Sequence, residues 1–133
     1  MAVFGLLAAA LGIVGLVSPA VQLSLLGFHQ PDHRATGDYT LVFLTASSMA
    51  ALNMGVYYVL AALADWRAFF RWTVPFRLLT FTVFTVAVLA GRAPSGFLGV
   101  GVWEGVGALV TGAALWREGR GAPAAPPEGA PAA

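Results

Sequence analysis

Apolar residues are gathered into four long stretches that are separated by short polar segments. These stretches cover about residues 3–23, 39–63, 73–90 and 97–116. Each is close to the roughly 20 mostly apolar residues that a helix needs to cross a bilayer. The pattern therefore predicts an all-α fold, an integral membrane four-helix transmembrane bundle over residues 1–118.

Prolines and glycines refine the expected boundaries. Pro19 has no backbone N–H, so we expect a kink or an early stop near the end of the first helix. Pro75 is expected in the first turn of the third helix, where proline is tolerated. Residues 91–96, GRAPSG, predict a tight turn before the fourth helix. Residues 119–133 are mostly Ala, Pro and Gly, and they are predicted to form a disordered tail.

Small residues recur at helical spacing on the first and fourth stretches. They include Gly5, Gly12 and Gly15 on the first, and Gly101, Gly105, Ala108 and Gly112 on the fourth. Stripes of this kind let two helix backbones approach closely in a membrane. We therefore expect both stripes to be helix-packing surfaces.

The composition agrees with a membrane location and excludes several kinds of chemistry. Of the 133 residues, 59% are hydrophobic and 10% are charged, against about 25% charged in soluble domains. The absence of cysteine excludes disulfides and thiolate metal sites. A net charge of +1 argues against nucleic acid as a partner. Arginines are more numerous beside the predicted helix ends that share a side with both termini, which favours cytoplasmic termini.

The longest polar segment between the stretches is residues 29–38, HQPDHRATGD. It contains four side chains of a metal-ligating type, His29, Asp32, His33 and Asp38. Their spacing matches no zinc signature, and Pro31 opposes the helix that would bring the two histidines together. We interpret the segment as a solvated loop, and the sequence predicts neither a metal nor a cofactor.

Glu104 is the one charged residue inside the fourth stretch. A carboxyl group among hydrocarbon chains is costly, so we expect it to face a neighbouring helix, a wet cavity or a partner. Arg77 lies about one turn inside the predicted third helix, where it either extends to the interface or turns inward. By counting from the turns, Arg77 is nearer the cytoplasm by a turn or more, so a direct pair with Glu104 requires helix tilt. A structural and a functional role for Glu104 both stay open.

The second stretch is the most polar, and it supplies two further candidates. Asn53 and Tyr57 are four residues apart, so they lie on one helix face. The other candidate ligand-binding side chains are Trp103, Ser48, Phe81 and Phe84. For the polar groups the alternative is hydrogen bonding between helices, or, for serine and threonine, to their own backbone.

Three segments carry a resemblance to known families. They are residues 53–58, NMGVYY; residues 65–77, DWRAFFRWTVPFR; and residues 90–96, AGRAPSG. Over residues 39–116 the chain resembles small bacterial four-helix membrane proteins of the BphX-like and DoxX-like groups. The resemblance implies a four-helix bundle in a bacterial inner membrane. The chain is also similar in size to small multidrug-resistance transporters, but those carry their essential glutamate in the first helix, where this chain has no acid.

Three functions fit these residues. The leading hypothesis is a non-enzymatic membrane module that binds a lipid-like small molecule or a partner membrane protein through Glu104, Asn53, Tyr57 and Arg77. An alternative is a cofactor-independent membrane enzyme, an isomerase or cyclase acting on an apolar substrate. There Glu104 would be the general acid or base, and Tyr57 or Asn53 would orient an oxygen. The third is a small proton-coupled transporter that works as a dimer. The expected partners are membrane lipids, an apolar small molecule, a second copy of the chain or another membrane protein.

Overall fold

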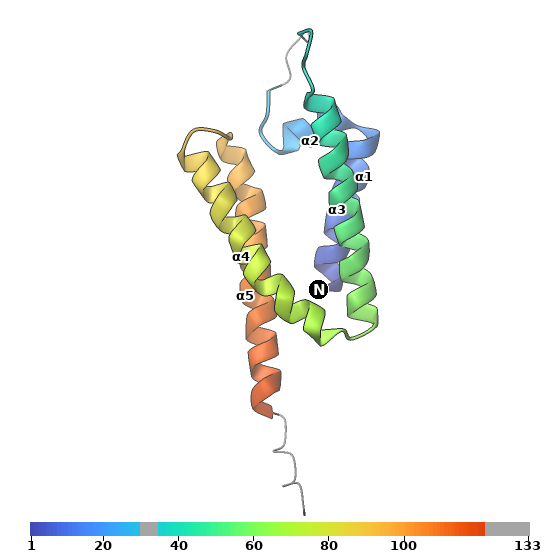
Figure 1. The fold of residues 1–133 in the computed structure, drawn as a ribbon, viewed down its shortest axis with the longest axis vertical. Helices are drawn as coiled ribbons and strands as arrows, with labels where there is room; N and C mark the ends of the chain where they lie inside the picture. Colours follow the sequence, from blue (N-terminus) through green and yellow to red (C-terminus); the bar gives the residue numbers. More distant parts are fainter. Residues whose placement is uncertain (30–34, 122–133) are drawn as a thin grey trace, which may run out of the picture.

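A computed structural model describes residues 1–29 and 35–121, and within them the chain is helical with no strand. The elements follow one another as drawn in Figure 1. They are α1 (Ala2–Val17), α2 (Pro19–Leu25), α3 (Thr40–Leu63), α4 (Arg67–Leu89), the 3-10 helix η1 (Ser95–Phe97) and α5 (Leu98–Gly121). The predicted all-α class is confirmed. Asp32 and His33 of the polar loop lie outside the described residues.

Three helices in the described part of the chain are long and apolar enough to cross a membrane. They are Thr40–Leu63, Arg67–Leu89 and Ser95–Arg120. α1 is also apolar but has only 16 residues, about 24 Å at 1.5 Å per residue, against about 30 Å for the hydrocarbon core. Large apolar side chains such as Phe43 and Leu89 are exposed on the protein surface. These features indicate a membrane protein.

The first predicted helix is two helices in the structure. α1 ends at Val17, and Ser18 leaves the helical region with φ −138° and ψ 78° before Pro19 opens α2. The residue before a proline is pushed out of the helical conformation, and proline itself cannot donate to the preceding turn. The predicted interruption at Pro19 is confirmed, whereas a count of four continuous helices is only approximate.

Two other predicted boundaries need correction. α4 begins at Arg67 rather than near Thr73, so Pro75 lies inside the helix and not in its first turn. Asp65, with φ 45°, makes the left-handed step that separates α3 from α4, a conformation that aspartate tolerates better than most residues. α5 continues to Gly121, so the first residues of the predicted tail are helical. Residues 122–133 lie outside the described part.

The helices form two pairs, α1 with α3 and α4 with α5 (Figure 1). In the first pair the backbones meet at glycines. A Cβ atom on Gly12 would lie 2.6 Å from the Leu52 nitrogen and the Ser48 oxygen, and one on Gly55 would lie 2.5 Å from the Ala9 nitrogen. The predicted glycine surface of the first stretch is therefore a packing surface, as small residues in membrane helices commonly form.

The second pair packs aromatic rings onto the glycines of α5. A Cβ atom on Gly105 would lie 3.2 Å from the Phe81 ring, and one on Gly101 would lie 3.4 Å from the Phe84 Cβ. This confirms the predicted packing stripe of the fourth stretch. Phe84 also contacts the Phe97 ring, with the ring centroids 4.7 Å apart.

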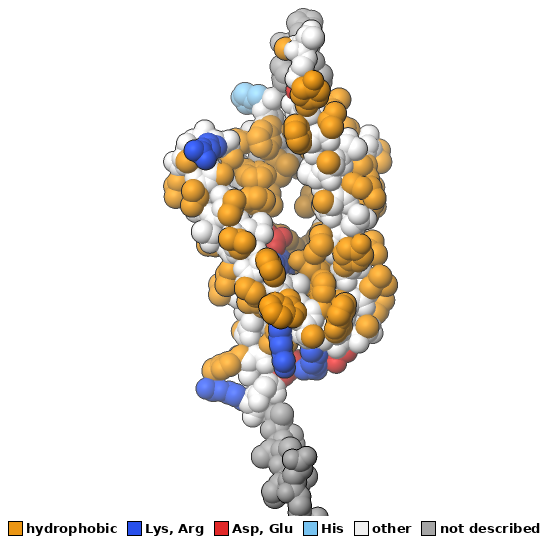
Figure 2. All heavy atoms as spheres, viewed as in Figure 1, with side chains coloured by type: hydrophobic (Ala, Val, Ile, Leu, Met, Phe, Trp, Pro, Cys, Tyr) orange, Lys and Arg blue, Asp and Glu red, His pale blue; other side chains and the backbone are white. Residues whose placement is uncertain are grey.

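Contacts between the two pairs are sparse. Figure 2 shows an opening between them, with apolar side chains along its sides. At the end that carries the residue 90–97 turn, Phe28 meets Phe97 edge to face at 5.9 Å. The N-terminus, the link between α3 and α4 and the end of α5 lie toward the other end (Figure 1). The arrangement leaves the middle of the bundle to be closed by a few long side chains.

Candidate functional site

Arg77 of α4 is a buried side chain that contacts both helix pairs. Its Nε donates a hydrogen bond of 2.7 Å to Oε2 of Glu104 on α5. Its guanidinium carbon lies 4.2 Å from the ring centre of Phe4 on α1, and 5.8 Å from that of Tyr58 on α3. This one side chain of α4 thus contacts α1, α3 and α5. We call Phe4, Tyr58, Arg77, Glu104 and Gly107 the Arg77 cluster.

The cluster is dry on the side of Arg77 and partly open on the side of Glu104. The Arg77 side chain is 3% exposed and that of Glu104 is 23% exposed. Within the described residues, Nη1 and Nη2 of Arg77 have no hydrogen-bond acceptor. The Phe4 ring offers a cation–π contact in their place. A buried donor without an acceptor is unfavourable, so Nη1 and Nη2 can still donate hydrogen bonds to an oxygen atom of a ligand.

The length of Arg77 explains how it reaches Glu104. The contacts of Phe81 with Gly105 and of Val74 with Gly112 show the register of α4 against α5. They place the Arg77 backbone more than one helical turn from Glu104, about 7 Å along the axis. The long arginine stem covers this distance, so the pair forms although the two backbones differ in depth. Of the two alternatives for Arg77, the inward one is confirmed.

Gly107 provides the space for the guanidinium group. A Cβ atom at this position would lie 2.5 Å from Nη1 of Arg77 and still closer to Nη2. Gly107 is three residues after Glu104, on the neighbouring part of the same helix face. The α5 backbone therefore forms one wall of the Arg77 cluster, and the Phe4 ring covers the group from α1.

We predict that Gly107→Ala destabilises the protein by about 1–3 kcal/mol, the usual range for overpacking a filled site. The added methyl group would displace the guanidinium from Glu104 and Phe4. Gly112→Ala on the same helix is the matched control, because its Cβ would meet only Val74 Cγ1 at 3.7 Å. Thermal unfolding in detergent should give a lower midpoint for Gly107→Ala than for Gly112→Ala. Equal unfolding midpoints would show that the guanidinium can move aside without a loss of stability.

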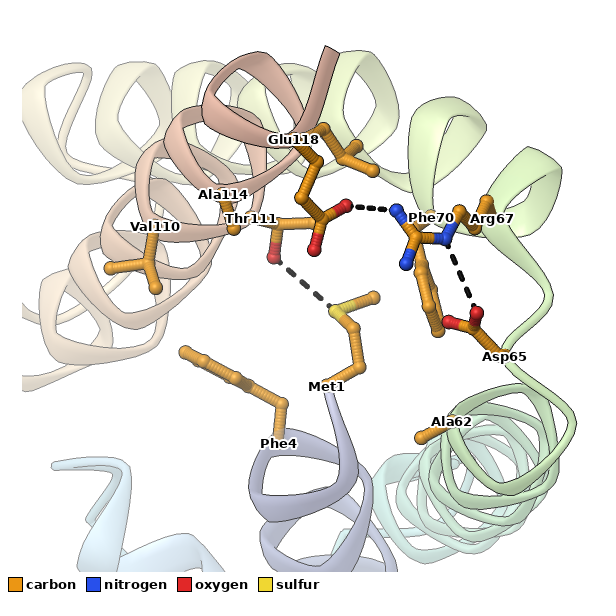
Figure 3. Close-up of a pocket in the computed structure, with 11 residues that line it drawn as sticks. Met1, Phe4, Ala62, Asp65, Arg67, Phe70, Val110, Thr111, Ala114 and Glu118 are labelled. Carbon is orange, nitrogen blue, oxygen red and sulfur yellow. Dashed lines mark hydrogen bonds and ion pairs between the residues drawn. The ribbon is translucent and has the colours of Figure 1, made fainter. Parts of the chain in front are cut away.

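Two hollows lie between α1 and α5, one on each side of the Arg77 cluster. The hollow toward the residue 90–97 turn, which we call the upper groove, has a volume of about 370 Å³. Its lining is apolar and comes from Leu7, Leu11, Leu25, Leu26, Gly96, Gly99, Val100 and Trp103. The hollow toward the termini, which we call the lower pocket, has a volume of about 260 Å³ and is shown in Figure 3.

The helix register places both hollows and the Arg77 cluster in one line. On α5, Trp103 of the upper groove, Gly107 of the cluster and Thr111 of the lower pocket follow at intervals of one turn. On α1, Leu7 lines the groove and Phe4 lines the pocket. The Phe4 and Trp103 rings pack with their centroids 4.4 Å apart. These two rings and the Arg77 guanidinium separate the groove from the pocket.

The lower pocket has a charged rim. Arg67 donates to Asp65 Oδ2 at 3.2 Å through Nε, and to Glu118 through Nη1, as Figure 3 shows. Thr111 Oγ1 donates to the Met1 sulfur at 3.3 Å. The three charged side chains are about half exposed or more. Exposed ion pairs add little stability, so the rim closes the pocket only loosely.

Two predicted site residues lie away from the cluster. Tyr57 is 54% exposed and Asn53 is also exposed, so the expectation that they face inward is wrong. The neighbouring Tyr58 is buried and contacts Arg77 instead. The reason is the close approach of α1 and α3 at Gly55, which determines the rotation of α3 about its axis. A step of one residue turns a side chain by about 100°.

The other predicted site residues have packing contacts. Ser48 is fully buried, and its Oγ donates a 2.8 Å hydrogen bond to Oε1 of Gln22 on α2, which matches the interhelical alternative. Phe81 and Phe84 pack on α5 glycines. Trp103 lines the upper groove, and its ring packs against that of Phe4. Only Glu104 and Arg77, with Trp103 beside them, come together as a site.

Sequence reasoning missed Phe4, Tyr58 and Gly107. Phe4 had a signal, because it is the one aromatic residue among residues 1–27. Gly107 lies in a run rich in glycine, which hid its particular role. Comparison with protein-family models, with curated proteins and with solved structures found no match for this chain. The resemblance to the BphX-like and DoxX-like groups therefore stays a prediction.

Proposed function

We propose that this protein is a non-enzymatic membrane module that binds a lipid-like small molecule between α1 and α5. The observation that carries this proposal is the apolar upper groove, which ends at Trp103, next to the part-buried Arg77–Glu104 ion pair. A groove of about 370 Å³ is within the usual range of small-molecule sites, roughly 300–1,000 Å³. Its apolar walls suit a hydrocarbon chain, and the Arg77 cluster suits the polar end of the same molecule.

We also propose that the module resides in a bacterial inner membrane with both termini in the cytoplasm. The N-terminus and the end of α5 lie toward the same end of the bundle, which agrees with this topology (Figure 1). Arginines are more numerous on the side that carries both termini, which favours a cytoplasmic location for that side. The enzymatic alternative is weaker. It requires Tyr57 or Asn53 to orient an oxygen near Glu104, but both side chains are exposed on the surface.

Filling the upper groove tests the proposal. We predict that Leu11→Trp weakens binding of monopalmitoyl compounds about ten-fold, which corresponds to about 1.4 kcal/mol. The indole would occupy the volume that the hydrocarbon chain needs. Leu6→Trp is the matched control, since Leu6 is an exposed leucine of the same helix that is not among the groove-lining residues. Native mass spectrometry of protein released from detergent micelles would report the bound fraction. Equal binding by both variants and the natural protein would contradict a site in the groove.

A further inference from the structure

Two arginines of α4 differ in how their guanidinium groups are satisfied. Arg67 pairs with two acids, Asp65 through Nε and Glu118 through Nη1. Arg77 pairs with one acid, Glu104, through Nε, while Nη1 and Nη2 meet no acceptor in the described part of the chain. The side chain of Arg67 is 48% exposed and that of Arg77 is 3% exposed. The arginine that is shielded from water therefore pairs with fewer carboxylates.

The free end of the Arg77 guanidinium defines the chemistry that would bind there. Nη1 and Nη2 form a planar fork of N–H donors, and a carboxylate or a phosphate matches such a fork with two parallel hydrogen bonds. The carboxylate is the smaller of the two, which suits the closed space between Phe4 and Gly107. An ester or alcohol would supply one neutral acceptor, which makes a weaker, single hydrogen bond. A second acid at Arg77 would also reproduce the two-acid arrangement already present at Arg67.

The surroundings provide a place for the rest of such a molecule. Gly107 lies one turn beyond Trp103 on α5, so the guanidinium lies about one turn from the end of the upper groove, behind the Phe4 and Trp103 rings. The Phe4 ring centre lies 4.2 Å from the guanidinium carbon of Arg77. Phe4 is half-buried and lines the lower pocket, so its ring has space to turn aside when a ligand oxygen arrives.

We infer that the ligand, if the function proposed above holds, is a single-chain carboxylic acid whose carboxylate binds Nη1 and Nη2 of Arg77. Its hydrocarbon chain lies in the upper groove along Leu7, Leu11 and Trp103. Phe4 rotates toward the lower pocket on binding. Glu104 stays on Nε and holds the guanidinium in position.

A ligand series on the unaltered protein tests the head group. Palmitate, methyl palmitate and hexadecanol share one chain, and binding is measured by native mass spectrometry. Palmitate should bind about ten-fold or more tightly than the ester or the alcohol, because hydrogen bonds to charged groups are the stronger ones. Equal binding of acid and ester would overturn the carboxylate inference and leave the proposed function standing. Binding of none of the compounds would overturn both. Tighter binding of the two-chain phosphatidic acid than of palmitate would overturn the assignment of a single-chain carboxylic acid.

A variant pair tests the role of Arg77. The double variant Arg77→Met/Glu104→Leu removes both charges together, so no buried charge is left unpaired. It should bind palmitate and methyl palmitate about equally, and so lose the preference for palmitate that the natural protein shows. Arg71→Met, which changes an exposed arginine of the same helix, should keep that preference. Circular dichroism and gel filtration would establish that each variant is folded. A retained preference in the folded double variant would overturn the inference.

Discussion

Glu104→Leu is expected to lower the free energy of unfolding by about 3–5 kcal/mol, the range for removing one partner of a buried ion pair. The substitution would leave the guanidinium of Arg77, a residue with a 3% exposed side chain, without its counter-charge. Arg77 also contacts both helix pairs, so the two pairs should separate more easily. Thermal unfolding in detergent micelles, followed by circular dichroism, would measure the change.

Two further variants test whether the loss of stability comes from the Arg77–Glu104 pair. Arg77→Met/Glu104→Leu should recover most of the loss, because apolar groups of similar size can replace a buried pair without penalty. Glu118→Leu removes the acid of a half-exposed pair with Arg67, and it should cost no more than about 1 kcal/mol. If Glu104→Leu were as mild as Glu118→Leu, the Arg77 cluster would not be what holds the pairs together.

Gly12→Ala should produce the second large effect, a loss of about 1–3 kcal/mol or more from overpacking. Its Cβ would lie 2.6 Å from two backbone atoms of α3. Backbone atoms cannot rotate away as a flexible side chain can, so α1 and α3 would have to separate. The measurement is again the unfolding midpoint in detergent.

Gly119→Ala is the control for Gly12→Ala. It also replaces a helical glycine, but its Cβ would meet no heavy atom within 4 Å. The unfolding midpoint of Gly119→Ala should stay unchanged or rise slightly, because alanine favours a helix more than glycine does. A similar drop in both variants would point to a general intolerance of alanine and not to the α1–α3 contact.

The helices were predicted correctly within the long apolar stretches, where a bilayer restricts the secondary structure that the backbone can adopt. A backbone inside hydrocarbon must satisfy its own hydrogen bonds, so long apolar stretches there form helices. The errors fell at the ends. Residues 67–72 are rich in Trp, Phe and Arg and lie before the third predicted stretch, but they form the first turns of α4. Composition suits them to the headgroup region and does not distinguish a helix from a link.

The site was predicted in part. Glu104 stood out because a lone acid in an apolar helix must find a partner, and Arg77 was one of few side chains able to reach it. Tyr57 and Asn53 were selected by shared spacing, which shows that two residues share a face but not which face is inside. Phe4, at the start of α1, comes from the opposite end of the chain to Glu104, so no local pattern connected them.

The amino-acid sequence by itself determined that this is a helical membrane protein with a single acid inside its last apolar helix. Hydrophobic length and the cost of a charge in lipid are local properties, so they can be recognised along the chain. Only the tertiary structure decided the rotation of each helix and therefore which side chains meet. The contact of Gly12 and Gly55 with the facing backbones turns Tyr58 inward and Tyr57 outward. The absence of a side chain at Gly107 leaves room for Arg77 beside Phe4. These outcomes depend on packing between distant residues, which spacing along one helix cannot show.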